Sequence, residues 1–166
     1  MPELKPLSRE SITRALEKAE RYRLLNEPVD AESICLDILS VDPANQQALV
    51  ALLLARTDQF GDELGEDAGT AEEVLRLLRD EYARAYYEGI IFERKAKAQL
   101  KRGKPGSGFA AFQSFQRAMS SYERAEAIRP PGNDDALLRW NACARILKRH
   151  PALGPAPEER VELPLE

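Results

Sequence analysis

The sequence predicts an all-α protein built from antiparallel pairs of helices. Apolar residues recur at helical spacing along nearly the whole chain, and no segment shows the alternating pattern rich in Val, Ile and Thr that is typical of a strand. Gly, Pro and Asn separate the periodic segments. The chain has 166 residues, of which 43% are apolar, so it can form one domain with its own core. We expect this domain over residues 8–150, followed by a Pro-rich tail over residues 151–166.

The first pair of helices is bounded by clear breaks. Ser8 is placed to cap the first helix, which is interrupted at Asn26–Pro28. The second helix ends at Pro43, which disfavours helical geometry at Asp42 and suits the first turn of a third helix. The apolar stripes of the pair are Ile12, Ala15, Leu16, Ala19 and Tyr22, then Ala31, Ile34, Cys35, Ile38 and Leu39.

An acidic segment, Gly61–Gly69, separates the third and fourth helices. The third helix carries Leu49, Leu52, Leu53 and Phe60. Thr70 is placed to cap the fourth helix and Glu73 to complete a capping box, with Val74, Leu75 and Leu78 facing the core. The acidic segment lacks the residue spacing of an EF-hand calcium loop, so we expect a solvated connector. Its carboxylates are Asp62, Glu63, Glu66 and Asp67.

The boundary between the fourth and fifth helices is left open by the pattern. No Gly or Pro separates them, and the apolar stripe from Val74 to Gly89 stays in phase, as it would in one long helix over residues 70–102. Asp80 is also placed to cap a separate fifth helix that runs from about Tyr82 to Leu100. We favour the break at Asp80.

Two further helices complete the domain. The Gly-rich stretch Gly103–Gly108 precedes a sixth helix over about Phe109–Ile128. Asn133 or Asp134 then caps a seventh helix. The inward residues of the seventh helix are Ala136, Trp140, Cys143 and Leu147.

We interpret the Gly-rich stretch as a bend between helices. A phosphate-binding Walker loop needs Lys-Ser or Lys-Thr after its last glycine and a strand before it, and neither is present. The spacing of Gly103, Gly106 and Gly108 does not match a dinucleotide-binding loop either. We therefore expect no nucleotide cofactor.

Charge and composition exclude several classes of protein. The formal net charge is −4, which argues against a nucleic-acid-binding domain. No run of about 18 apolar residues is present, so we expect no membrane span. The N-terminal residues have no apolar core typical of a secretory signal. The abundance of Arg and Ala indicates a bacterial protein, and we expect a cytoplasmic location.

The residue types that carry most catalysis are scarce. Cys35 and Cys143 both lie in apolar stripes, which predicts buried free thiols. With one histidine, His150, the chain has no familiar zinc or catalytic constellation. Adjacent carboxylates such as Glu72 and Glu73 point to different sides of a helix. We expect no enzyme activity, no catalytic residues, no metal and no cofactor.

Small and aromatic residues recur at matching offsets in the helix pairs. In the first pair Tyr22 and Ala31 are nine residues apart. The first pair contains Ala19, Tyr22, Ala31 and Pro43, and the later helices contain Gly89, Phe92, Ala118, Tyr122, Ala125 and Pro130. On these residues the chain resembles the tetratricopeptide-repeat (TPR) family over about Ile12–Leu147, with one whole repeat at Ile12–Asn45.

The resemblance implies a solenoid of about three antiparallel helix pairs followed by a C-terminal capping helix. Small residues in such repeats let paired helices approach closely. The middle pair departs from the pattern, because Arg56 stands where the repeat has an aromatic residue. The third pair is longer than the repeat requires between Phe92 and Ala118. Because helical composition continues on both sides of the bend, we expect an elongated hairpin that projects on the order of 10 Å.

The elongated hairpin carries the candidate partner site. A basic face with neighbouring aromatic residues suits an acidic partner segment. The alternative is a solvated basic face over buried aromatic side chains. The candidate residues are Arg94, Lys97, Lys101, Lys104, Phe109 and Phe112.

The resemblance implies a non-enzymatic protein–protein interaction module that binds a peptide or helix in a concave groove. One TPR subtype clamps a chaperone's terminal carboxylate with Lys and Asn at the positions of Leu16, Glu20 and Ala51 here, so we do not expect that activity. Two alternatives stay open: a small chaperone for a secreted or assembling partner, and a homo-oligomer that pairs through its first helix.

Overall fold

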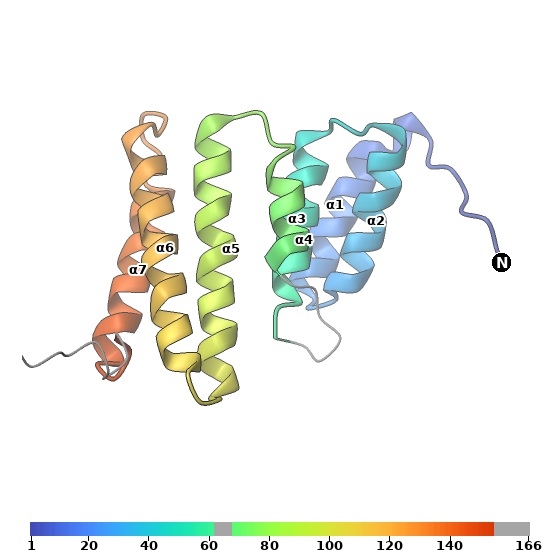
Figure 1. The fold of residues 1–166 in the computed structure, drawn as a ribbon. Helices are drawn as coiled ribbons and strands as arrows, with labels where there is room; N and C mark the ends of the chain where they lie inside the picture. The colour runs from blue at the N-terminus through green and yellow to red at the C-terminus, as the bar shows by residue number, and fades with distance from the viewer. Residues whose placement is uncertain (62–67, 155–166) are drawn as a thin grey trace, which may run out of the picture.

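A computed structural model describes residues 1–61 and 68–154 of the chain. This part is all helical: seven α-helices follow a short 3₁₀ helix, η1 (Arg9–Ser11), and no strand is present in it (Figure 1). The predicted fold class, all-α, is therefore confirmed. The α-helices are α1 (Ile12–Leu24), α2 (Pro28–Val41), α3 (Gln46–Asp58), α4 (Ala68–Leu75), α5 (Glu81–Arg102), α6 (Ser107–Ala127) and α7 (Asp135–Arg149).

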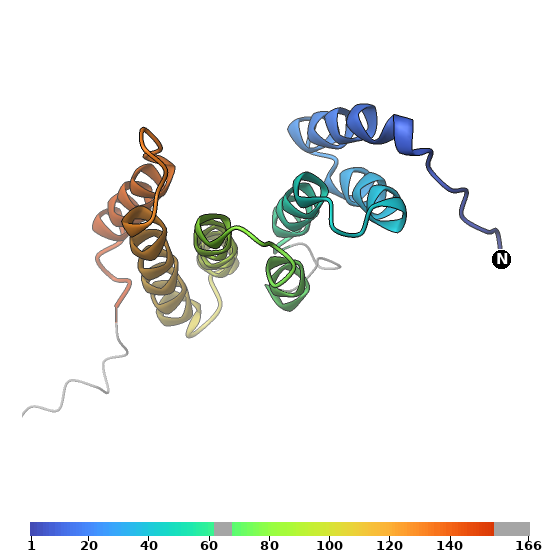
Figure 2. The ribbon, with the colours of Figure 1, turned by 90° about the horizontal axis from the view of Figure 1, so that it is seen from above.

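Most consecutive helices pack against each other in antiparallel orientation. Contacts also join helices that are not consecutive, because α1 packs on α3 and α3 packs on α5. Viewed from above, the helices form a row that begins with α1 and α2 and ends with α6 and α7 (Figure 2). Two hydrophobic clusters fill the row. One lies among α1–α4 and includes Ile91 of α5, the other lies among α5–α7, and Leu54 and Tyr87 pack against both.

Small residues are buried between the helices. Ala19, Ala31 and Ala118 are completely buried, and Gly89 is also buried. A Cβ atom at Gly89 would lie 2.4 Å from Cε1 of Tyr122, a distance that real structures do not tolerate. The four small residues therefore permit close packing, as expected from the sequence.

The fourth and fifth helices are separate, as favoured from the sequence. The α-helix α4 ends at Leu75, and the Asp80 side chain caps α5 by accepting a hydrogen bond from the Ala83 amide at 2.8 Å. The intervening backbone is held by Gln46, whose side chain accepts from the Arg79 amide at 2.9 Å. The capping interaction outweighs the unbroken apolar stripe because it satisfies a free amide at the start of α5.

Four local expectations need correction. The Ser8 side chain makes no capping bond, and α1 is preceded by η1. Pro43 lies before α3 and not in its first turn; Asn45 caps α3 by accepting from the Ala48 amide at 2.9 Å. Phe60 follows the end of α3. Thr70 lies inside α4, which begins two residues earlier, so it is not the N-cap.

Two expectations fall outside the described residues. The acidic side chains of Asp62, Glu63, Glu66 and Asp67 lie in the first undescribed segment. Most of the predicted tail, from residue 155 to 166, lies in the second.

Arg56 has a structural role in the middle of the row. Its Nε donates to Glu32 of α2 at 3.0 Å, and its NH1 donates to the Thr70 carbonyl of α4 at 2.9 Å. A charged residue is therefore accommodated here because it links three helices through satisfied hydrogen bonds.

The helices α5 and α6 form the long hairpin that the sequence predicts. Gly103 ends α5 with a φ of 61°, and Gly106 precedes α6 with a φ of 80°, both in the left-handed region that favours glycine. The tip of the hairpin extends past the nearby ends of α1–α4 (Figure 1). Although these are the longest helices, neither they nor any other helix in residues 1–61 and 68–154 has an apolar stretch suited to crossing a bilayer.

Candidate functional site

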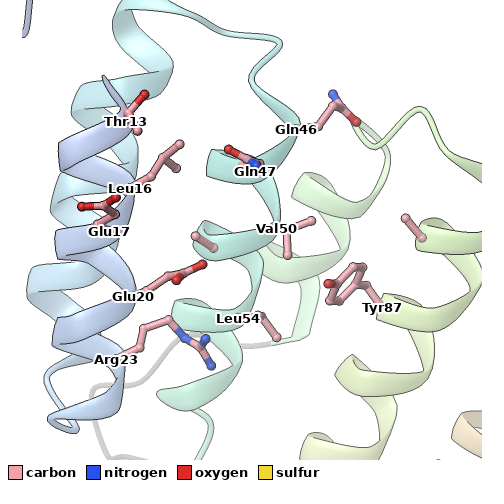
Figure 3. Close-up of a pocket in the computed structure, with 12 residues that line it drawn as sticks. Thr13, Leu16, Glu17, Glu20, Arg23, Gln46, Gln47, Val50, Leu54 and Tyr87 are labelled. Atoms are coloured by element: carbon pink, nitrogen blue, oxygen red, sulfur yellow. The ribbon is translucent and has the colours of Figure 1, made fainter. Parts of the chain in front are cut away.

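An open groove with a volume of about 570 Å³ runs along α1, α3 and α5 (Figure 3). These three helices alternate in the chain, so the groove depends on their side-by-side packing. The residues that line it are Thr13, Leu16, Glu17, Glu20, Arg23, Gln46, Gln47, Val50, Ala51, Leu54, Ala83 and Tyr87.

The floor of the groove is mainly apolar. Val50, Leu54 and Tyr87 are half-buried, so each packs against the core and also presents surface to the groove. Leu16 of α1 is half-buried as well, and Ala51 is small and buried. An apolar floor open to solvent is a surface that a partner can cover with a favourable hydrophobic contribution.

The α1 edge of the groove is acidic. Glu17 and Glu20 are exposed, and neither takes part in an ion pair within the described residues. In Figure 3 the Glu20 side chain extends from α1 toward the groove, and Glu17, which also lines it, lies one turn earlier on α1. The two unpaired negative charges favour a positively charged group in an occupant.

Arg23, which lines the groove, shares a carboxylate with Arg94 of α5. The Nε of Arg23 donates to Asp58 at 2.7 Å, and NH1 of Arg94 donates to the other oxygen of the same carboxylate. Arg94 also donates to Thr57 Oγ1 at 2.7 Å. Asp58 therefore links α1, α3 and α5, the three helices that form the groove.

Burial lowers the pKa of Arg94, and the Asp58 carboxylate opposes this shift. The nearby Arg23 and Arg139 lower the pKa further because like charges repel. The Asp58 charge is therefore needed to hold two guanidinium groups close together.

A second charged cluster surrounds the buried carboxylate of Glu93, which is 1% exposed. It accepts hydrogen bonds from Tyr122 at 2.5 Å and Lys97 at 2.6 Å, and from Arg139 at 3.4 Å. Burial and the Glu93 charge raise the pKa of Tyr122, so its hydroxyl stays protonated and donates. These bonds join α5, α6 and α7 and satisfy the carboxylate from within the fold.

The predicted basic-hairpin residues lie in different surroundings. Arg94 and Lys97 bond to Asp58 and Glu93, so both contribute to contacts inside the fold. Lys101 and Lys104 are exposed at the hairpin tip. Phe109 and Phe112 are half-buried, and neither projects freely into solvent. The structure therefore brings Lys101 and Lys104 together but does not gather all six residues on one surface.

Sequence reasoning missed most of the groove residues. It named Leu16 in the apolar stripe of the first helix, and it named Leu16, Glu20 and Ala51 as positions where a carboxylate clamp is absent. The available signal was the spacing of Thr13, Leu16, Glu17 and Glu20, which places them on one side of α1 beside the apolar stripe.

The two thiols are buried and free, as predicted. Burial raises the pKa of Cys35 from 9.0 to about 11 and that of Cys143 from 9.0 to about 12. Neither is therefore a reactive thiolate at neutral pH. No group of three or more His, Cys, Asp or Glu residues suited to a metal ion occurs in the part of the chain that the structure describes.

Neither protein-family models, curated proteins nor solved structures give a match to this chain.

Proposed function

We propose that this chain is a non-enzymatic protein–protein interaction module of the TPR kind, which binds a peptide or helix in the groove of α1, α3 and α5. The main support for this proposal is the groove: α1, α3 and α5 form an open surface with an apolar floor and an acidic edge. Stacked helix pairs would place their first helices side by side in this way. On this proposal α7 acts as the capping helix and α5–α6 is the elongated third pair.

Two further observations support the repeat interpretation. The small residues Ala19, Ala31, Gly89 and Ala118 are all buried, as close packing of helix pairs requires. The contacts of α3 with both α1 and α5 are those expected between first helices of successive pairs.

The groove favours an amphipathic segment that carries Lys or Arg. Apolar side chains of the segment would cover Leu16, Val50 and Tyr87. A cation beside them would face Glu17 and Glu20, the two carboxylates without an ion-pair partner in the described residues. The same surface would serve a small chaperone whose client supplies such a segment.

Selection from a random peptide library followed by calorimetry tests this proposal. We expect selected peptides to combine apolar residues with Lys or Arg. Val50→Arg should weaken their binding at least about tenfold, because it places a long cationic side chain on the groove floor. Glu17→Lys/Glu20→Lys should weaken binding similarly and reverse the preference for basic peptides.

A matched control uses the same charge change away from the groove. Glu73→Lys/Glu81→Lys alters two exposed residues of α4 and α5 that do not line the groove, and affinity should not change. Equal affinity of the wild type and both folded groove variants for every selected peptide would contradict the proposal.

The hairpin tip is a second candidate for an acidic partner. It extends from the row of helices (Figure 1), and Lys101, Arg102 and Lys104 are exposed there. Lys101→Glu/Lys104→Glu should abolish binding of acidic peptides while binding of basic peptides to the groove is retained. Unchanged binding of acidic peptides would remove this candidate.

A further inference from the structure

The outer side of α1 carries a stripe of positive charge. Arg14, Lys18 and Arg21 recur at helical spacing and are all exposed. They line a shallow surface depression of about 370 Å³, together with Glu17, Tyr22 and Leu25. The Nζ of Lys18 lies 5.9 Å from the centre of the Tyr22 ring. The basic stripe therefore lies beside apolar surface.

The neighbouring helix α2 carries negative charge at a similar spacing. Asp30 is exposed and Asp37 is half-buried, and the exposed Ser33 lies between them at helical spacing. None of the charged residues of the two stripes takes part in an ion pair within residues 1–61 and 68–154. Three positive and two negative charges thus lie on adjacent helices without an ion-pair partner in that part of the chain.

The two stripes are in register along the helix axes. The helices α1 and α2 form an antiparallel hairpin, and Arg9 NH2 donates to the Val41 carbonyl at 3.2 Å, which places the start of α1 beside the end of α2. Counting inward from that bond, each basic residue of α1 comes within one residue of the level of a polar residue of α2. The levels are Arg14 with Asp37, Lys18 with Ser33, and Arg21 with Asp30. We call these six residues, with Leu25, the α1–α2 end face.

The α1–α2 end face lies at one end of the row of helices (Figure 2). Apolar side chains are exposed on it or next to it: Leu25 is 62% exposed, Val29 66% and Leu36 46%. These apolar side chains, next to unpaired charges, are surface that a partner could cover.

We propose that the α1–α2 end face binds a second copy of this chain, with α1 of each copy against α2 of the other. A two-fold axis parallel to the helices brings α1 of one copy opposite α2 of its partner. Rotation about this axis leaves every residue at the same position along the helix axis. Arg14 of each copy then faces Asp37 of the other, and Arg21 faces Asp30. A two-fold axis perpendicular to the helices would instead place α1 against α1, with basic residues opposed.

The middle level of this interface lacks an anion. Lys18 of one copy faces Ser33 of the other, and the short serine side chain leaves the ammonium group without a charged partner. This level therefore offers a place where one substitution can strengthen the dimer, which a surface unrelated to dimerisation would not show.

The α1–α2 end face contains none of the residues that line the groove of α1, α3 and α5, so either can fail without the other. Glu17 lies at the border, because it lines both the groove and the depression beside the basic stripe. Exposed ion pairs are individually weak, and the dimer is therefore salt-sensitive. The apolar contribution comes from Leu25 of one copy beside the start of α2 of the other, near Val29.

Sedimentation equilibrium over a wide range of concentration tests the proposal. We expect a monomer–dimer equilibrium at low salt that shifts towards monomer as salt is added. Arg14→Glu and Asp37→Arg should each raise the dimer Kd at least about tenfold, because each change opposes like charges twice in a symmetric dimer. Arg14 lies near the start of α1 and Asp37 towards the end of α2, so both new charges suit the helix dipole and both variants should fold.

Ser33→Glu provides the opposite result. It places a carboxylate opposite Lys18 twice in the symmetric dimer, and the dimer Kd should fall about threefold to tenfold. The exposed α7 variant Lys148→Glu is the control, and it should dimerise like the wild type. A Kd that Ser33→Glu raises or leaves unchanged would contradict the predicted level of Lys18 and Ser33.

Mixing the two weakened variants is the sharpest test. Each alone opposes like charges, but a heterodimer of Arg14→Glu with Asp37→Arg restores an ion pair at both contacts, so the mixture should dimerise with near wild-type affinity. If α1 instead faced α1, Arg14→Glu would relieve repulsion and dimerise, with itself or with the wild type, more tightly than the wild type does. That result would overturn the proposal. So would a wild-type chain that stays monomeric at low salt, or folded single variants that dimerise as well as the wild type.

Discussion

Gly89 of α5 packs directly against the ring of Tyr122 of α6, and a Cβ atom at position 89 would lie 2.4–2.9 Å from three atoms of that ring. Tyr122 is completely buried, so its ring has no open space into which to move. The hydroxyl of the same ring donates to Glu93 at 2.5 Å. The absence of a side chain at Gly89 therefore permits both the close packing of α5 on α6 and the position of the Glu93 hydrogen bond.

Gly89→Ala should destabilise the protein by about 1–3 kcal/mol, measured by urea unfolding. The added methyl group forces the Tyr122 ring or the two helices apart, and overpacking of this kind usually outweighs the better helix propensity of alanine.

The matched control is Gly108→Ala in α6. There a Cβ atom would meet Leu153 at an ordinary distance of 3.5 Å. This variant should be as stable as the wild type or gain up to about 1 kcal/mol. Equal stability of Gly89→Ala and Gly108→Ala would contradict the proposed role of Gly89.

Tyr122→Phe should lower the free energy of unfolding by about 1–3 kcal/mol, because it leaves the buried Glu93 carboxylate without one of its donors. Lys97 and Arg139 remain as donors, so the protein should stay folded. Tyr22→Phe is the control, since the Tyr22 hydroxyl makes no hydrogen bond within the described residues. If the two variants unfold at the same denaturant concentration, the Glu93 network does not stabilise the α5–α6 hairpin.

The helical framework could be predicted from local signals in the sequence. The break at Asp80, the bend at Gly103–Gly108 and the buried positions of Ala19 and Ala118 each follow from capping, glycine conformation or apolar spacing. The exact starts of α3 and α4 could not be predicted in this way. Asn45 and Pro43 are both residues that favour the start of a helix, and Thr70 is as compatible with the inside of a helix as with its cap.

Asp58→Asn should destabilise the packing of α1 and α5 on α3. The change removes the negative charge that Arg23 and Arg94 share, and these hydrogen bonds to a charged group contribute about 1–3 kcal/mol together at this partly exposed site. A double-mutant cycle with Arg23→Gln, measured by thermal unfolding at low and high salt, isolates the pair. Strict additivity of the two changes would show that Arg23 and Asp58 do not interact.

Alkaline pH should destabilise the folded chain through its two thiols. Burial raises the pKa of Cys35 to about 11 and that of Cys143 to about 12, whereas an exposed thiol in the unfolded chain has a pKa of 9.0. The folded state therefore keeps protons that the unfolded state releases. This contribution to stability is present below about pH 9 and is lost progressively as pH rises towards the folded-state values.

Each thiol should contribute a decrease of about 1.4 kcal/mol per pH unit in that window. The free energy of unfolding of Cys143→Ala should thus fall less steeply than that of the wild type above about pH 9. The comparison uses slopes, because the lost packing of the Cys143 side chain lowers stability at every pH. Parallel slopes for the two proteins would show that the Cys143 thiol ionises equally in both states.

The candidate site was less predictable than the helices because it depends on contacts between distant residues. The sequence predicts Arg94 as one member of a basic helix face. Its ion pair with Asp58 forms only because α3 packs beside α5. Glu93 ends the apolar run from Ile90, yet only the fold reveals that Tyr122 and Arg139 satisfy it. The groove likewise requires α1, α3 and α5 together, and no single segment encodes it.

Methyl NMR during titration with a selected basic, amphipathic peptide tests the central claim most directly. We expect shifts at Leu16, Val50 and Leu54, which line the groove, and none at Leu75 and Ile128, which line a different depression formed by α4, α5 and α6. Shifts confined to Leu75 and Ile128, with Leu16 and Val50 unchanged at saturation, would contradict binding in the groove.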